Sequence, residues 1–173
     1  PSNMVLAVTG HFDWDAFVSN AEKYCMDWPS FHSERSTERF RREPIIREYR
    51  RSGLHESHLL LMSEGPSAQD DERFAWLVLS TIIGDCAGSA FYWDLVESGL
   101  ADTASLEIDE KDGTGCIVAY AVTSPDRFDL VETKLRKLLE RAGDFTDEEL
   151  NRAKKKLCAR IVHNGELPMG RLL

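Results

Sequence analysis

The sequence predicts an α+β domain of two layers, with helices packed on one face of a mainly antiparallel sheet. One observation is a pair of alternating apolar and polar segments, 104–109 and 116–122, around the turn sequence Lys111-Asp112-Gly113, which is typical of an antiparallel hairpin. The other is that five segments carry apolar residues at helical spacing, whereas only two further segments resemble strands. The face of the sheet without helices is then free to meet another domain.

The first third of the chain reads as strand, helix and strand. Residues 4–9 form a short apolar run ended by Gly10, which predicts a core strand. A helix is predicted from Asp13 until Pro29 closes the segment, with an apolar face of Phe17, Ala21, Tyr24 and Trp28. Residues 57–62 predict a second strand, and a turn at Gly65-Pro66-Ser67 follows it.

Two helices are predicted before the hairpin. Asp70 can cap the first, which ends at Gly84 and has an apolar face of Phe74, Leu77, Val78 and Ile82. The second runs from Gly88 to Glu97 and is stopped by Gly99.

Two more helices are predicted after the hairpin. Ser124-Pro125-Asp126 predicts the start of the first, because a hydroxyl, a proline and an acid all suit a helix N-terminus. Its apolar stripe is Phe128, Val131, Leu135, Leu138 and Leu139. Thr146-Asp147-Glu148-Glu149 is a capping box that predicts the last long helix, with a stripe of Leu150, Ala153, Leu157 and Ile161.

Composition narrows the function classes. The 173 residues are 42% hydrophobic and 29% charged, which is ordinary for one globular domain with a sizeable core. A net charge of -9 opposes nucleic acid as a partner, because binding to phosphates needs a surplus of Lys and Arg. No apolar run reaches the ~20 residues that cross a bilayer, so we expect no membrane partner. The chain opens with Pro1 and shows no signal peptide, which we interpret as an excised boundary that leaves cytoplasm and periplasm both open.

Two further features are interpreted as structural. Residues 30–52 have no apolar period and carry seven arginines against four glutamates, so a solvated connector is favoured over an anion site. The arginines are Arg35, Arg39, Arg41, Arg42, Arg47, Arg50 and Arg51. Four scattered cysteines without a Cys-x-x-Cys pair favour buried free thiols, with two disulfides as the alternative. They are Cys25, Cys86, Cys116 and Cys158.

No residue pattern predicts a metal site in this chain. Zinc needs three or four convergent ligands, and no two histidines are spaced as a helical pair. The histidines are His11, His32, His55, His58 and His163. His55 and His58 lie closest, but residues three apart on a strand point to opposite faces. We therefore assign no metal, cofactor-binding or catalytic residue.

Two patterns resemble catalytic groups and are better explained by structure. Residues 84–89 lack the spacing and the lysine of a phosphate loop, and Ser89 lacks the Gly-x-Ser-x-Gly context of a nucleophile. Small residues there favour a tight turn between packed helices. Phe91, Tyr92 and Trp93 are expected to divide between core and interface. Asp94 and Glu97, three apart, are interpreted as exposed acids rather than a catalytic pair.

Several segments, in order along nearly the whole chain, resemble the inactive, C-terminal type of domain in zinc peptidases of the pitrilysin, insulinase and mitochondrial-processing-peptidase family. They are residues 4–13, Gly84 through Ala101, Gly113-Thr114-Gly115, Thr123-Ser124-Pro125 and Glu148 through Lys154. The resemblance implies a processing-peptidase-like metallohydrolase fold and a single inactive-type domain over residues 1–173, cut from a longer multidomain chain.

The resemblance also implies the role of such a domain. In this family, related α+β domains form two halves that close around a peptide, and a His-x-x-Glu-His motif on one domain holds the zinc. This chain lacks that motif, so zinc is expected only in a catalytic domain of the parent protein. The implied partners are that catalytic domain, the second half of the shell and the peptide substrate. The implied function is to enclose and position peptide for hydrolysis elsewhere, and the alternative is a scaffold or assembly domain of a protease-like protein without peptidase activity.

At two positions this chain departs from some inactive domains of the family. Those domains place an arginine just after the leucine of the glycine-rich helix and a tyrosine seven residues later, and both touch substrate. With one deletion allowed, the corresponding positions here are approximately Val96 and Asp102, so no substrate-binding residue is carried over. A packing role follows for this domain. Removal of its neighbours is also expected to expose an apolar face that favours self-association of the isolated chain, so a homo-oligomer is a possible form of it.

Overall fold

The computed structural model describes residues 4–29, 31 and 43–171 of the chain. The chain divides into two compact units, one of residues 37–157 and one of residues 1–36 together with 158–173. The larger unit contains the sheet and the helices that cover it, and the smaller one contains the first helix.

The sheet of the larger unit has three strands, β1 (Ser57–Glu64), β2 (Thr103–Lys111) and β3 (Thr114–Thr123). Their order is β1-β3-β2, and both neighbouring pairs are antiparallel. The predicted hairpin is confirmed as β2 and β3, and its two-residue turn places Gly113 at a φ of 70°, which favours glycine.

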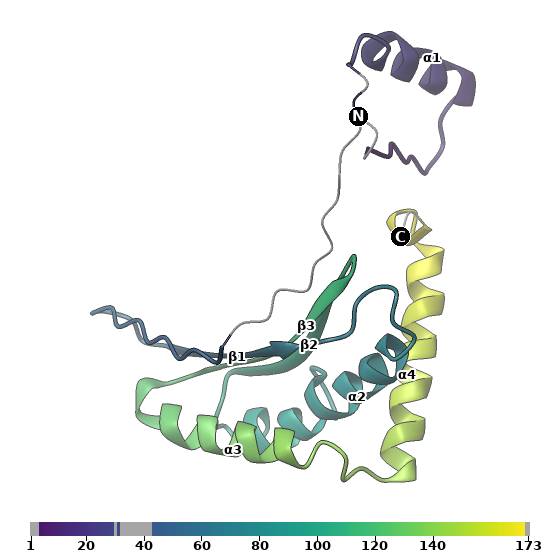
Figure 1. Ribbon diagram of the computed structural model, residues 1–173. Coiled ribbons are helices and arrows are strands. Elements are labelled where there is room, and N and C mark those ends of the chain that lie inside the picture. The colour runs from purple at the N-terminus through teal and green to yellow at the C-terminus, as the bar shows by residue number, and fades with distance from the viewer. Residues whose placement is uncertain (1–3, 30, 32–42, 172–173) are drawn as a thin grey trace. The chain divides into compact units, whose positions relative to one another are not determined.

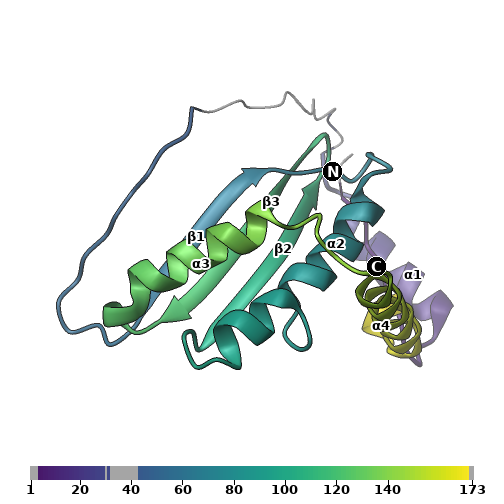
Figure 2. The ribbon, with the colours of Figure 1, turned by 90° about the horizontal axis from the view of Figure 1, so that it is seen from below.

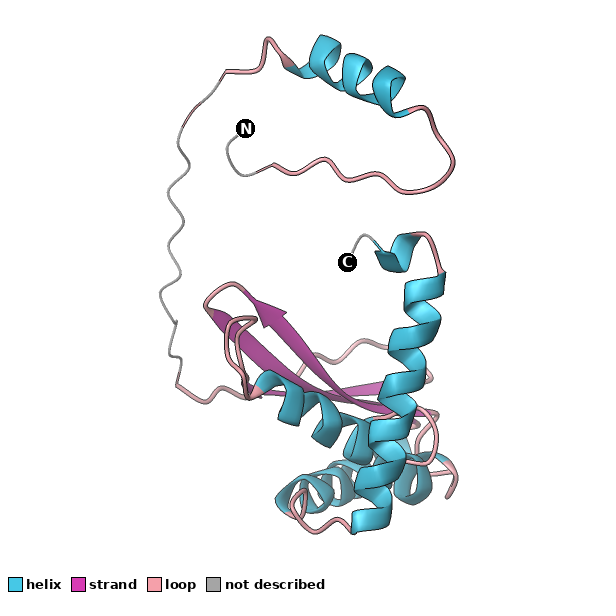
Figure 3. Cartoon of the chain, turned by 90° about the vertical axis from the view of Figure 1, so that its right-hand side faces the viewer, coloured by secondary structure: helices cyan, strands magenta, loops and turns pink. Residues whose placement is uncertain are grey.

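The helices of this unit lie on one side of the sheet. They are α2 (Arg73–Gly84), the π-helical turn η1 (Tyr92–Val96), the 3-10 turn η2 (Pro125–Arg127), α3 (Phe128–Glu140) and α4 (Asp147–Glu166), which belongs to this unit as far as residue 157. Figures 1 and 2 show α2 beside β2 and α3 across β1 and β3, on the same face, and Figure 3 shows this layering from the side. The predicted two-layer α+β fold is confirmed.

The core fills the space between these two layers. Leu59, Ala119 and Leu106 point from three neighbouring strands toward the helices and are at most 7% exposed. From α3, Val131 and Leu135 are fully buried, as the predicted stripe requires. Because alternate strand residues face opposite sides, Leu60 and Met62 lie on the face without helices, where each remains more than half exposed.

The residues at the start of α4 form the hydrogen bonds of the capping box that the sequence predicts. The Thr146 hydroxyl accepts the Glu149 N–H at 3.2 Å, and the Glu149 carboxylate accepts the Thr146 N–H at 2.8 Å. The Thr146 N–H and the Thr146 hydroxyl both donate to the Glu149 carboxylate at 2.8 Å, and these two bonds lower the pKa of Glu149 because they stabilise its charged form. The predicted capping box is therefore confirmed.

The smaller unit contains α1 (Trp14–Cys25) and the 3-10 turn η3 (Met169–Arg171), besides residues 158–166 of α4. The helix begins where the sequence predicts it, and Asp13 is its N-cap, with a side chain that accepts the Ala16 N–H at 2.9 Å. Phe12 and Phe17 meet edge to face across this cap, with ring centroids 5.6 Å apart. No residue of α1 is buried.

Three predictions in this unit were wrong. Residues 4–9 are not a strand and pair with no strand of the described sheet, and Val5 is 93% exposed. An apolar run cannot specify which ladder partner it takes, and a strand needs one. The first helix ends at Cys25, so Trp28 lies beyond it. The predicted apolar stripe of α4 does not extend to Ile161, because that side chain is 67% exposed.

Three local predictions in the larger unit also need correction. Asp70 does not cap α2, which starts at Arg73; its carboxylate instead accepts the Ser67 N–H at 2.8 Å and closes the turn after β1. The segment before Gly99 is helical but of π type. The Ser124 side chain makes no cap bond, and a 3-10 turn precedes α3.

Two further predictions concern the arginines of residues 30–52 and the four cysteines. Arg35, Arg39, Arg41 and Arg42 lie outside the described residues, while Arg50 pairs with Glu48 at 2.5 Å. All four cysteines are free, but none of them is buried as predicted: Cys86, on a turn, and Cys158, on α4, are exposed, and Cys25 and Cys116 are partly exposed. Among the described helices, none combines the length and the apolar character that crossing a membrane requires.

Candidate functional site

The glycine-rich segment after α2 is built for close packing. Gly84 lies against β2, so that a Cβ at this position would overlap the backbone and side chain of Leu106. Ser89 is 1% exposed; its hydroxyl donates to the Asp85 carbonyl at 2.6 Å and accepts the Tyr92 N–H at 3.1 Å. With both functions of its hydroxyl engaged by backbone, Ser89 holds the turn rather than attacking a substrate.

The aromatic run divides between core and surface, as predicted. Phe91 is fully buried with Leu95, whereas Trp93 is 57% exposed. The Tyr92 hydroxyl donates to the Glu97 carboxylate at 2.9 Å, and this bond raises the pKa of Tyr92. Glu97 thus pairs with a phenol on the same turn.

The expected surface role of Asp94 is compatible with the structure. Asp94 is exposed on η1, and its carbonyl accepts the Ser98 hydroxyl at 2.8 Å. The carboxylate of Glu97, in contrast, is held by Tyr92. The two acids have separate surroundings, and neither lies in a pocket that would support acid–base chemistry.

A contact that the sequence did not reveal ties α4 to this turn. The Lys156 ammonium pairs with the Asp85 carboxylate and donates to the Ala87 carbonyl at 2.8 Å. The Asp85 side chain is only 9% exposed, so the pair is partly shielded from water. In the sequence Lys156 belongs to a run of basic residues on α4, and only its closeness to Asp85 in space distinguishes it from them.

Val96 and Asp102 have surroundings that fit a packing role. Val96 packs against the buried core, and its carbonyl accepts the Gly99 N–H at 2.9 Å. Asp102 is exposed at the start of β2, where its N–H donates to the Val122 carbonyl at 2.8 Å. A valine in the core and a short acid at a strand start offer no cation or phenol for a peptide.

The histidines do not converge on a metal site. His55 precedes β1, and His58 lies on β1, where its Nδ1 is 2.7 Å from the Tyr120 hydroxyl. The imidazole ring of His58 and the phenol ring of Tyr120 are stacked, with ring centroids 6.0 Å apart. Over the ranges that the structure describes, no group of three His, Cys, Asp or Glu side chains is placed to hold a metal ion. The described residues therefore do not fit zinc.

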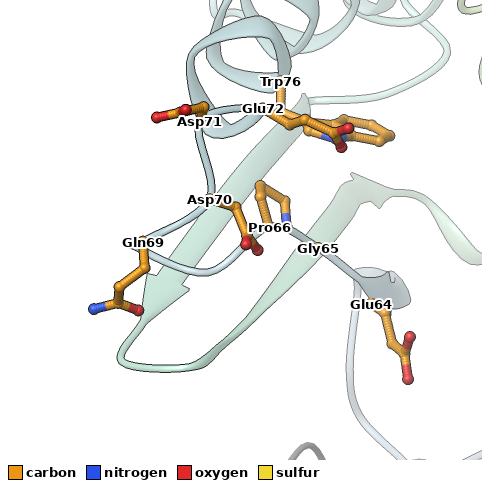
Figure 4. A pocket seen from close by; sticks show the side chains of 8 residues that line it. All are labelled: Glu64, Gly65, Pro66, Gln69, Asp70, Asp71, Glu72 and Trp76. Carbon is orange, nitrogen blue, oxygen red and sulfur yellow. The ribbon is translucent and has the colours of Figure 1, made fainter.

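A shallow hollow lies where β1 leads into α2, and Figure 4 shows the side chains around it. Its volume is about 490 Å³, and its rim carries Glu64, Asp70, Asp71 and Glu72 beside the ring of Trp76. Asp70 is engaged by Ser67, as described above. The hollow is acidic and open, and no nucleophile or imidazole lines it.

The open face of the sheet in the larger unit carries exposed apolar side chains. One row across it consists of Leu60, Tyr120 and Ser105 on the three strands. Beside this row lie His58 and Met62, both exposed on β1. Exposed apolar side chains together on a flat sheet are typical of a surface that meets another protein surface.

Comparison with known proteins identifies a matching family and similar structures. A family model described as the peptidase M16 inactive domain matches residues 1–157. A search of curated proteins found no match. The chain is similar in structure to a protease from Helicobacter pylori, with a TM-score of 0.72 and 18% identity over 94% of this chain and 41% of that one.

Two solved inactive domains are also similar. One is the peptidase M16 inactive domain from Pseudomonas fluorescens, with a TM-score of 0.59 and 17% identity over 62% of this chain and 27% of that one. The other is the inactive peptidase domain of a proposed zinc protease from Bordetella parapertussis, with a TM-score of 0.58 and 24% identity over 70% and 68%. The chain thus spans less than half the length of the Helicobacter pylori protein, and at these identities the likeness shows the fold.

Proposed function

The chain belongs to the peptidase M16 inactive-domain family, and on that premise we propose that it is the non-catalytic domain of a zinc-dependent endopeptidase. In this proposal the domain forms a wall of the chamber that encloses peptide. Hydrolysis takes place at a zinc site on another domain of the parent protein. The family match over residues 1–157 is the observation that carries the proposal.

Two features of the larger unit support a wall rather than a reactive centre. The described residues contain no cluster of three metal-ligating side chains, and Ser89, the residue most like a nucleophile, is buried with its hydroxyl engaged. The open sheet face offers apolar area, with Leu60 and Met62 more than half exposed. Such a face can meet a neighbouring domain or the chain of an unfolded peptide.

Reconstitution tests this function. The chain alone should hold no stoichiometric zinc after dialysis and should cleave no unfolded peptide. Joined to the remaining domains of its parent, it should raise kcat/KM for peptide hydrolysis, while zinc content follows the other domains. One equivalent of tightly bound zinc in the isolated chain, lost in His55→Ala or His58→Ala, would overturn the proposal.

A scaffold role is the second candidate, and Val96 and Asp102 favour it. These residues replace the arginine and tyrosine with which some related inactive domains touch substrate. In that case the parent protein carries no His-x-x-Glu-His motif and the assembled protein cleaves no peptide. The sequence of the parent gene separates the two roles, because the enzyme role requires that motif on another domain.

A further inference from the structure

The turn of the β2–β3 hairpin contains a dipeptide that is open to a covalent rearrangement. β2 ends at Lys111 and β3 begins at Thr114, so Asp112 and Gly113 make the turn between them. Gly113 has a φ of 70°, a conformation that favours glycine because glycine has no Cβ. The missing side chain also leaves the Gly113 nitrogen unshielded. The turn therefore requires, directly after an aspartate, the residue whose nitrogen can most easily attack that aspartate.

The rearrangement joins the Asp112 side chain to the Gly113 nitrogen. When the Asp112 carboxyl group is in its acid form, this nitrogen attacks Cγ, and the N–H proton and the carboxyl hydroxyl leave together as water. The product is a cyclic imide, a succinimide, which water opens again. Breaking the new Cγ–N bond restores aspartate, whereas breaking the original peptide C–N bond gives isoaspartate. In isoaspartate the main chain runs through Cβ and Cγ and is one carbon longer.

Gln69 binds both of the groups that must react. Its amide nitrogen donates to Asp112 Oδ1 at 3.1 Å, and its amide oxygen accepts the Gly113 N–H at 2.9 Å. For the attack, the carboxyl group must turn toward the Gly113 nitrogen and that nitrogen must give up its proton, so both bonds must break. All three residues belong to the unit of residues 37–157, and Figure 4 shows Gln69 on the loop beside the end of the hairpin.

The loop that carries Gln69 is itself fixed to the hairpin through backbone. The Ala68 N–H donates to the Lys111 carbonyl at 3.1 Å, one residue before Gln69 and one before the turn. A Cβ added at Gly115 would overlap the Pro66 carbonyl oxygen, so the backbones of the loop and of β3 are in direct contact. These contacts hold the Gln69 amide close to the turn.

We propose that Asp112 is a site of isoaspartate formation in this chain and that Gln69 restrains the reaction in the folded state. One side chain, 43 residues away from Asp112, binds both reacting groups. An extra main-chain carbon does not fit a two-residue turn, so isoaspartate should disturb the register of β2 with β3 from the turn inward. The proposal concerns the chemistry of the chain itself and does not rest on the proposed proteolytic role.

Peptide mapping by mass spectrometry tests the proposal after a long incubation of the folded chain in mildly acidic buffer. Gln69→Ala should raise the rate of isoaspartate formation at Asp112 by about tenfold, because both hydrogen bonds to the reacting groups are lost. In urea neither chain keeps these bonds, so the unsubstituted chain and the Gln69→Ala variant should react at the same rate.

The matched control is Arg73→Ala. Arg73 lies 3.5 Å from Glu110 of β2, so this substitution removes another tie to the same end of the hairpin and leaves both bonds of Gln69 in place. The variant should form isoaspartate at the rate of the unsubstituted chain, and circular dichroism establishes that both variants are folded. Equal rates in the folded unsubstituted chain and in Gln69→Ala overturn the proposal. An equal rise in Arg73→Ala also overturns it, because the cause would then be a loosened hairpin.

Discussion

Replacing Gly84 by alanine tests whether the glycine-rich segment serves packing. On helix propensity alone, alanine should stabilise α2 by up to about 1 kcal/mol. The added Cβ, however, would overlap the Leu106 backbone nitrogen, Cα and Cβ. These atoms belong to β2, which is held by β3 on its other side, so they cannot move away as a flexible side chain could.

The magnitude follows from these two opposing effects. Forcing an extra carbon into a well-packed core costs about 1–3 kcal/mol, and contact with backbone belongs at the upper end of that range. We therefore expect Gly84→Ala to lower the free energy of unfolding by about 2 kcal/mol after the gain in propensity. The assay is equilibrium urea unfolding followed by circular dichroism.

Two other glycines provide matched controls. A Cβ added at Gly143 would meet no atom within 4 Å, and the φ of this residue is not positive, so Gly143→Ala should stabilise the chain by about 0.5 kcal/mol. Gly88 also has open space but a φ of 73°, so Gly88→Ala should cost about 1 kcal/mol through its backbone alone. If the Gly84→Ala variant is as stable as the unsubstituted chain while the Gly143→Ala variant is more stable, the packing argument is refuted.

Four further outcomes are expected from unfolding experiments. Ser89→Ala should lower the free energy of unfolding by about 1–3 kcal/mol, because it leaves a buried N–H without its acceptor; an unchanged midpoint would contradict this role. Lys156→Met should lower the free energy of unfolding by about 1–2 kcal/mol, because it removes the partner of the Asp85 carboxylate. The same substitution should cost less in a chain that already carries Asp85→Asn, and a double-mutant cycle measures this difference. Thr146→Ala should cost about 1 kcal/mol at neutral pH. Because the pKa of Glu149 is lowered in the folded chain, the stability from its charge is complete above its unfolded pKa near 4.5 and is lost as pH falls through the folded value. The difference in melting temperature between Glu149→Gln and the parent chain should shrink from about pH 6 to about pH 3, and a constant difference would argue against the cap.

The parts of the fold that sequence predicted well depend on contacts between residues near each other in the chain. The hairpin of β2 and β3 turns over Asp112 and Gly113, and the capping box joins Thr146 to Glu149. The apolar stripe of α3 follows the period of its own helix. Each of these signals lies within a few residues, so no knowledge of the tertiary structure is needed to find it.

The failures depend on partners distant in sequence. Residues 4–9 have the composition of a strand, but pairing decides whether an apolar run becomes one. Asp70 suits a helix cap, yet its carboxylate is taken by the Ser67 N–H and α2 begins three residues later. For Lys156, the partner Asp85 is 71 residues away along the chain. A sequence alone does not show such pairs.

The candidate surface was harder to predict than the fold, for a related reason. The sequence predicts helices on one face of the sheet only, and within the unit of residues 37–157 the described helices lie on one face. Which side chains occupy the other face depends on register: Leu60, Tyr120 and Ser105 form a row only because β1 and β2 both pair with β3. A shift by one residue would have turned Leu60 toward the helices and Leu59 toward solvent.

The contrast between the buried Ser89 and the exposed side chains of β1 is relevant to function. The segment that most resembles a reactive motif places its hydroxyl, Ser89, where only backbone can reach it, and its glycine against a strand. On β1, in contrast, an imidazole bonded to Tyr120 and two apolar side chains, Leu60 and Met62, are exposed. Such groups recognise another surface but do not by themselves cleave a bond, because cleavage requires a nucleophile, an acid or base and a stabiliser of charge placed together. Binding measurements that use variants of Leu60 and Met62 therefore test directly the role proposed for this sheet face.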